Sequence, residues 1–156
     1  MFGLGKIKFM PGTFGSLATT ILLFYLFHSQ NISSNIILIG LIIIFIYSFY
    51  AISSHTKGSK NKDPGEIIID EFLGQSIPIY LYEISHGTTK ENNEAIVYYV
   101  LFFILFRYFD IMKPFPVNFF DKNFKNSFGV IMDDICAGLY VVLTVVCFMI
   151  VKDFAL

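Results

Sequence analysis

Residues 63–75 read Asp63-Pro64-Gly65-Glu66-Ile67-Ile68-Ile69-Asp70-Glu71-Phe72-Leu73-Gly74-Gln75 and place four carboxylates among apolar residues. A helix capped by Asp63, with Pro64 at its first position, would set Asp63, Glu66 and Asp70 three and four residues apart on one face. Glu71 would then point elsewhere. We expect this face to hold a divalent cation, and the charged residues of other apolar segments to meet it there.

The composition indicates a membrane protein. Of 156 residues, 55% are hydrophobic and only 15% are charged, with a mean hydropathy of +0.66, which is too apolar for an ordinary soluble domain. A helix needs roughly 20 mainly apolar residues to cross a bilayer. The uncharged runs are Leu17–Phe27, Ile36–Ile52, Ile96–Phe106 and Ile135–Val151. The sequence therefore predicts an all-α fold: one domain over residues 1–156, a small polytopic helical bundle with about four to five membrane-embedded helices.

Several classes of function and processing are excluded or have no support. No basic surface for nucleic acid is present, and Cys136 and Cys147 have the spacing of neither a metal site nor a redox pair. No glycine-rich phosphate loop occurs. Lys6 and Lys8 precede an apolar run, as in a signal peptide, but no small-residue cleavage site follows, so we expect the first segment to remain.

The distribution of lysines predicts the topology. Basic residues favour cytoplasmic loops, and they occur before the first segment, in the loop 57–62 and in a loop containing Lys122 and Lys125. Five crossings with the N-terminus inside put all three loops in the cytoplasm. The segment Ile67–Tyr82 is the least certain crossing, because it can also dip into the membrane and pack against its neighbours.

This topology brings three charged clusters to one membrane face. The first is the stretch 63–75. Arg107, Asp110 and Lys113 lie in the last turns of the fourth segment, which Pro114 and Pro116 stop. Asp133-Asp134 lies near the start of the fifth. Carboxylates near an apolar phase need neutralisation, and Mg²⁺ prefers oxygen ligands together with substrate phosphate.

Basic side chains supply the other half of a phosphoryl site. The Arg107 guanidinium is a planar fork that matches phosphate oxygens, and the Lys113 ammonium is a compact charge. Carboxylates, Arg and Lys at a membrane face therefore indicate phosphoryl chemistry on a substrate with a lipid tail.

Each cluster also has a plain structural interpretation. Asp63 and Glu66 fit a capping box, Arg107 with Asp110 fits an ion pair within a helix, and Asp133-Asp134 fits acids at a helix start. Their convergence at one face favours function. The alternatives are a small ion or solute transporter, which predicts charges near the membrane midplane, and a non-catalytic scaffold.

The opening of the chain is a glycine-rich, basic loop that leads into the first apolar helix. Thr13 or Ser16 can cap that helix. Backbone amides at such a helix start favour anions.

Four blocks of sequence together resemble the phosphatidylglycerophosphatase A family of bacterial membrane lipid phosphatases. They are Pro11–Leu17, Asp63–Glu71 with Gly74-Gln75, Phe106–Ile111 with Lys113-Pro114, and Gly129–Asp134 with Ala137-Gly138. The resemblance implies Mg²⁺-dependent hydrolysis of phosphatidylglycerophosphate to phosphatidylglycerol and phosphate at the bacterial inner membrane. Phe115 stands where the family is expected to have Trp.

The resemblance and the residue chemistry together assign roles. The predicted metal ligands are Asp63, Glu66, Asp70 and Asp134. Arg107 and Lys113 are predicted to hold the phosphate, and Glu71 or Asp133 to accept the proton of the attacking water. Amides near Thr13, Gly15 and Ser16 are predicted to contact the glycerophosphate head group. The oligomeric state is not predicted.

Overall fold

The computed structural model describes residues 11–56, 68–86, 92–124 and 126–155. These residues form a helical protein, as predicted. The elements in chain order are α1 (Pro11–Phe24), the π-helical turn η2 (Tyr25–Ser29), α2 (Ser34–Thr56), α3 (Ile69–His86), α4 (Asn92–Met112), α5 (Val117–Asn123) and α6 (Ser127–Ala155). Asp63 and Glu66 lie outside the described residues, as do the lysines before Pro11 and between positions 57 and 62.

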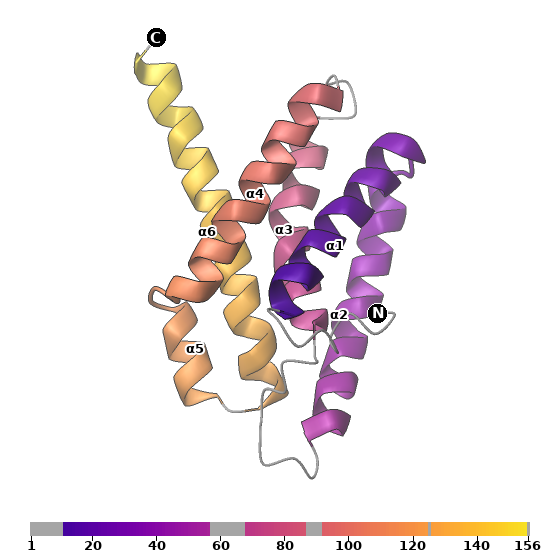
Figure 1. The fold of residues 1–156 in the computed structure, drawn as a ribbon, viewed down its shortest axis with the longest axis vertical. Coiled ribbons are helices and arrows are strands. Elements are labelled where there is room, and N and C mark those ends of the chain that lie inside the picture. The colour runs from indigo at the N-terminus through magenta and orange to yellow at the C-terminus, as the bar shows by residue number, and fades with distance from the viewer. Residues whose placement is uncertain (1–10, 57–67, 87–91, 125, 156) are drawn as a thin grey trace.

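The five longer helices alternate in direction (Figure 1). α1, α3 and α6 run one way along the bundle, and α2 and α4 run the other way. Within the described residues, three segments are long and apolar enough to cross a membrane: Ser34–Ser54, Asn93–Met112 and Ser127–Lys152. The starts of α1, α3 and α6 and the end of α4 therefore lie at the same end of the bundle, where the sequence predicts the charged clusters to meet.

α3 is the central helix and packs against α1, α2, α4 and α6. Its crossing with α6 is very close, because a Cβ atom added to Gly74 would lie 2.5 Å from the backbone oxygen of Asp134. Small residues let helix backbones approach in this way in membranes. The core beside α3 contains Leu23, Phe27 and Phe106, all fully buried.

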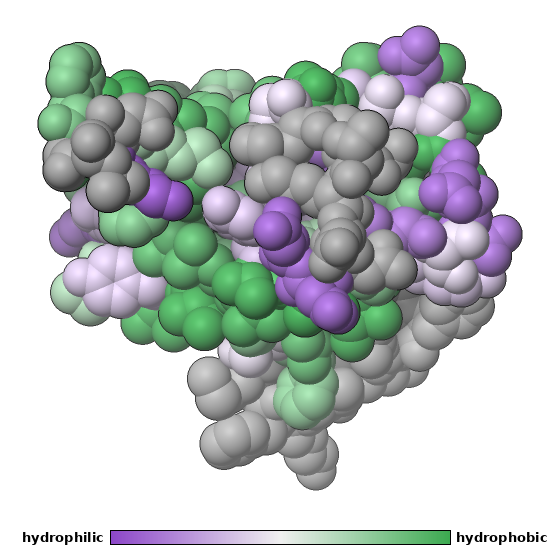
Figure 2. Space-filling model, turned by 90° about the horizontal axis from the view of Figure 1, so that it is seen from above, coloured by the Kyte–Doolittle hydropathy of each residue, from purple (hydrophilic) through white to green (hydrophobic). Residues whose placement is uncertain are grey.

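The outer surface is unusually apolar. Large side chains of α2 such as Ile39, Ile43 and Ile46 are about 60% exposed, which in water would form an extended apolar patch. Figure 2, viewed from the end opposite the starts of α3 and α6, shows hydrophilic side chains in patches on the end face with hydrophobic surface between them. Apolar sides with polar patches at the end are what a lipid bilayer requires of a helical bundle.

Three local expectations are corrected. The segment around Lys122, expected to be a loop, contains helix α5. Its first residue, Val117, is fully buried, and its phenylalanines pack edge-to-face on one another and on Phe128. Thr13 and Ser16 lie inside α1 and do not cap it; the Ser16 hydroxyl donates to the Gly12 carbonyl oxygen one turn earlier. The helix that was expected to be capped by Asp63 does not run unbroken to Asp70, because Ile68 is not helical. α3 begins at Ile69, and Asp70 lies in its first turn.

A buried polar cluster joins η2, α3 and α4 at the far end of the bundle. Nε2 of His28 lies 3.0 Å from Oε1 of Glu83, and the Tyr99 hydroxyl donates to the same oxygen at 3.0 Å. The side chains of His28 and Glu83 are only 5% and 2% exposed. The widened turn of η2 carries the His28 ring to this position, where it stacks on Phe24.

This cluster is expected to stabilise the fold. His28→Leu should lower the free energy of unfolding by about 1–2 kcal/mol, because Glu83 loses one of its two hydrogen-bond partners inside the bundle. Thermal unfolding in detergent measures the change. A cycle with Glu83→Gln should show coupling between the two positions; strictly additive effects would contradict the pairing.

Candidate active site

Three carboxylates from two helices come together at the start of α3. Asp70, Glu71 and Asp134 each offer an oxygen, and these oxygens lie within 4.8 Å of one another. Asp70 and Asp134 are only 5% and 4% exposed. Oδ1 of Asp134 and Oε2 of Glu71 are buried and have no hydrogen-bond partner. Such a set of unneutralised oxygens is chemically suited to a hard divalent cation.

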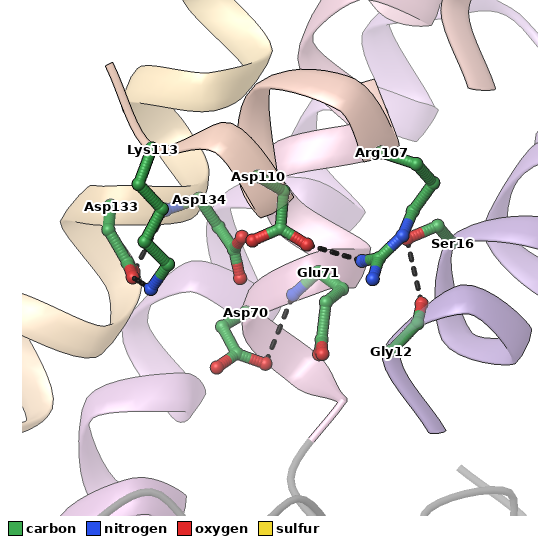
Figure 3. A network of polar contacts seen from close by, with 9 residues as sticks. All are labelled: Gly12, Ser16, Asp70, Glu71, Arg107, Asp110, Lys113, Asp133 and Asp134. Atoms are coloured by element: carbon green, nitrogen blue, oxygen red, sulfur yellow. Dashed lines mark hydrogen bonds and ion pairs between the residues drawn. The ribbon is translucent and has the colours of Figure 1, made fainter. Parts of the chain in front are cut away.

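Arg107 of α4 forms the wall next to Glu71, as Figure 3 shows. Its Nη1 donates to Oδ2 of Asp110 one turn later, while its Nε is buried without a partner. Gly12 makes room for this arrangement: a Cβ there would lie 2.5 Å from Oε1 of Glu71 and 3.2 Å from Nη1 of Arg107. The start of α1, the start of α3 and the end of α4 thus meet at one point.

Lys113 forms a second polar group beside the first. It follows the last residue of α4 with a positive φ of 44°, and its Nζ donates to Asp121 of α5 at 2.8 Å and to Asp133 of α6 at 2.9 Å. Burial lowers the pKa of Lys113, but hydrogen bonds and charge from Asp121 and Asp133 outweigh it, and the pKa is raised above its ordinary value. Lys113 therefore stays charged and ties α4, α5 and α6 together.

The structure brings most of the predicted site residues together, with two differences in geometry. Glu71 was expected to point away from Asp70, but both side chains reach the same cluster. The cluster lies where α3 packs against both α1 and α6, so adjacent residues of α3 can both contribute to it. Asp133 is directed to Lys113 rather than to the three clustered acids (Figure 3). The geometry therefore favours Glu71 over Asp133 as a neighbour of a bound cation.

The predicted head-group residues lie on the first turns of α1. Gly15 packs against Ile68: a Cβ atom added to Gly15 would lie 3.1 Å from the Cβ atom of Ile68. α1 therefore contacts the residue that directly precedes α3. The Thr13 hydroxyl is buried and has no partner. First-turn amides have no acceptor within their own helix and face anions favourably. In α1 this applies to Thr13, whereas Gly15 and Ser16 lie further along, where backbone amides bond to carbonyls of their own helix. The geometry therefore supports the predicted amide contact at Thr13 and gives no support for it at Gly15 and Ser16.

The ion pair of Arg107 with Asp110 is the one expected within the helix, whereas the roles of three other residues of this region were not predicted. Asp121 holds Lys113, Gly12 supplies space, and Gln75 is fully buried with neither amide atom hydrogen-bonded. Gln75 lies one turn after Glu71 on the same face of α3. The sequence did contain a signal for Gln75: it is a polar residue four positions after an acid, inside an apolar helix.

A membrane-embedded helical bundle with clustered acids beside Arg and Lys at one end defines a class of protein, the integral membrane phosphatases. The family model described as Phosphatidylglycerophosphatase A matches residues 1–149. The chain belongs to the phosphatidylglycerophosphatase A family, and it is a phosphoric monoester hydrolase.

Curated relatives from three bacteria cover most of the chain. Phosphatidylglycerophosphatase A of Haemophilus influenzae is 38% identical over 144 residues, 92% of this chain and 82% of the relative. Phosphatidylglycerophosphatase A of Escherichia coli K12 is 31% identical over 140 residues, 88% of this chain and 73% of the relative. A putative phosphatidylinositol-3-phosphatase of Bacteroides thetaiotaomicron is 31% identical over 140 residues, 89% and 83% of the two chains. No solved structure matches the chain.

Proposed function

We propose that this protein hydrolyses phosphatidylglycerophosphate to phosphatidylglycerol and inorganic phosphate, with Mg²⁺ as cofactor, at the cytoplasmic face of the bacterial inner membrane. The observation that carries the proposal is the convergence of Asp70, Glu71 and Asp134 next to Arg107 at one end of an apolar bundle. The names of two relatives support the substrate. The lysine-rich loops of the sequence support the cytoplasmic face.

The donor set fits magnesium. All three clustered residues offer carboxylate oxygens, which are the ligands that Mg²⁺ prefers, and two of those oxygens are buried without any other partner. Asp70, Glu71 and Asp134 would hold the ion, and Asp63 and Glu66 remain candidate ligands outside the described residues. When bound, Mg²⁺ supplies charge neutralisation at the phosphate and lowers the pKa of water at the site.

The protein side chains bind and orient the phosphate. Arg107 presents donors from the wall beside Glu71, where a phosphate group near the acids would meet them. Amides at the start of α1 approach from the same side. Lys113 holds Asp133, and through it the second turn of α6, in position. In this geometry the proton of the attacking water passes to a carboxylate of the cluster, with Glu71 better placed than Asp133.

The proposed function has two alternatives, another lipid substrate and a transport function. The relative named for phosphatidylinositol 3-phosphate shares the chemistry of a lipid phosphomonoester but has another head group. A transporter would use the same intramembrane carboxylates. The family match favours the phosphatase, and the clustered acids lie in the first turn of α3 and the second turn of α6 rather than at the middle of either helix.

One assay separates these functions. Purified protein is given phosphatidylglycerophosphate or phosphatidylinositol 3-phosphate in mixed micelles, with Mg²⁺ or with excess EDTA. We expect phosphate release from phosphatidylglycerophosphate that EDTA lowers at least 100-fold and added Mg²⁺ restores. Release that EDTA leaves unchanged would contradict the metal, and preference for the inositol lipid would reassign the substrate.

Arg107→Lys is expected to lower kcat/KM roughly 100-fold, although the charge is kept. Lys lacks the planar fork, so it cannot present two parallel donors to a phosphate while another nitrogen of the same group holds Asp110. Steady-state phosphate release measures the effect, with Lys122→Ala, an exposed cation of α5, as the control. Wild-type rates for Arg107→Lys would remove Arg107 from the phosphate site.

A further inference from the structure

An apolar groove runs along the outside of the bundle between α2, α3 and α6. Its volume is about 370 Å³, and its lining includes Leu38 and Ile42 of α2, Leu73, Ile77 and Tyr80 of α3, and Ile135 of α6. Almost all of its surface is hydrocarbon. This volume lies near the lower end of the range that is usual for small-molecule binding pockets.

The lining of the groove begins one helical turn from the acid cluster along α3. Leu73 lies three residues after Asp70, and Ile135 directly follows Asp134. Residues 70, 73, 77 and 80 fall on one face of a helix, so a single stripe of α3 starts with a clustered carboxylate and continues as the groove wall. The close crossing of Gly74 with the Asp134 backbone puts the two starting points at the same level.

The groove then leads away from the end of the bundle. From Leu73 to Leu81, both in its lining, α3 rises about 12 Å at 1.5 Å per residue. Two other grooves described in the structure follow α6 from Val142 to Lys152 and so begin about two turns beyond Asp134. Of these three grooves, the one between α2, α3 and α6 has lining residues nearest in sequence to the clustered acids.

We propose that this groove seats one acyl chain of the lipid substrate while its terminal phosphate lies at Asp70, Glu71 and Asp134. The inference rests on the proposed function and adds a site for the tail. A diacyl phospholipid has its polar end at the membrane surface and its chains pointing inward. Along α3 the clustered acids come first and the groove lining follows in the same order.

The groove acts on orientation more than on affinity. Lipid tails are as apolar as the groove, so moving a chain from bilayer or micelle into it yields little hydrophobic free energy. A seated chain instead fixes the rotation and depth of the head group, and misplacing a reacting group by about 1 Å can cost up to 100-fold in rate. Blocking the groove should therefore lower kcat for long-chain lipids.

The test compares two neighbouring substitutions on α2. Ile42 lines the groove and Ile43 does not, yet both are isoleucines exposed on the apolar surface, at 49% and 60%. Ile42→Trp should lower kcat about fivefold or more on long-chain phosphatidylglycerophosphate and leave the dihexanoyl form, whose chains are too short to fill the groove, unchanged. Ile43→Trp should change neither. Equal rates for the two variants on both lipids would overturn the proposal.

A binding measurement separates failure of the groove from failure of the proposed function. Phosphatidylglycerophosphate with a photoreactive group in its acyl chain should label α2 and α3 residues of the groove in the wild type, and lose that labelling in Ile42→Trp. Labelling spread evenly over the apolar surface overturns the groove even if both lipids are hydrolysed. If neither lipid is hydrolysed, the proposed function fails while the labelling pattern still decides the groove.

Discussion

Asp134→Asn is expected to lower phosphatase activity roughly 1,000-fold while leaving the metal-free protein at least as stable as the wild type. The activity falls because the variant loses one of three carboxylates that would hold the cation, and metal charge at a phosphoryl group is worth several kcal/mol in the transition state. The stability is kept because Asp134 is buried near two other acids and its Oδ1 has no partner, so a neutral amide of the same shape removes repulsion.

The measurement pairs phosphate release with thermal unfolding in detergent containing EDTA, and then with added Mg²⁺. Mg²⁺ should raise the Tm of the wild type and have little effect on Asp134→Asn. Glu94→Gln, which neutralises an exposed acid in the first turn of α4, is the control and should behave as wild type. A marked loss of metal-free stability in Asp134→Asn would make this carboxylate structural.

The meeting of the charged clusters could be predicted from the sequence because it depends on long-range rules. Uncharged runs long enough to span, short connections and lysine-rich loops determine which helix ends share a face, and the structure places the start of α3, the end of α4 and the second turn of α6 together. Membrane proteins restrict the backbone to few arrangements, so this level of the fold follows from pattern alone.

The Arg107–Asp110 ion pair could be predicted from its three-residue spacing in a helix, but the partners of Lys113 could not, because they depend on side-chain geometry that no spacing encodes. Arg107, Asp110 and Lys113 share one helix end, yet Arg107 bonds Asp110 while Lys113 turns to Asp121 and Asp133. That choice follows from the positive φ of Lys113 and from helix α5, which brings Asp121 within reach. A seven-residue helix held by aromatic packing carries too weak a periodic signal to be read from sequence.

Gly138→Ala is expected to destabilise the fold by about 3 kcal/mol and to lower activity roughly 100-fold. A Cβ at this position would overlap the backbone oxygen of Gly74, and the converse contact, from a Cβ at Gly74 to the Asp134 oxygen, is 2.5 Å. Both obstacles are backbone atoms, so no side-chain rotation relieves them and α3 must move away from α6. Asp70 and Glu71 are carried by α3 and Asp134 by α6, so this movement opens the acid cluster itself.

Gly40→Ala in α2 is the matched control, since an added Cβ there meets nothing within 4 Å. It should leave activity unchanged and raise stability slightly, because alanine favours the helix over glycine by up to about 1 kcal/mol. For Gly138→Ala the unfolding temperature should fall and the Mg²⁺ concentration for half-maximal activity should rise. In the control the unfolding temperature should rise slightly, and the Mg²⁺ concentration for half-maximal activity should not change. Full activity with normal Mg²⁺ dependence in a destabilised Gly138→Ala would mean that the α3–α6 crossing supports the fold without positioning the acids.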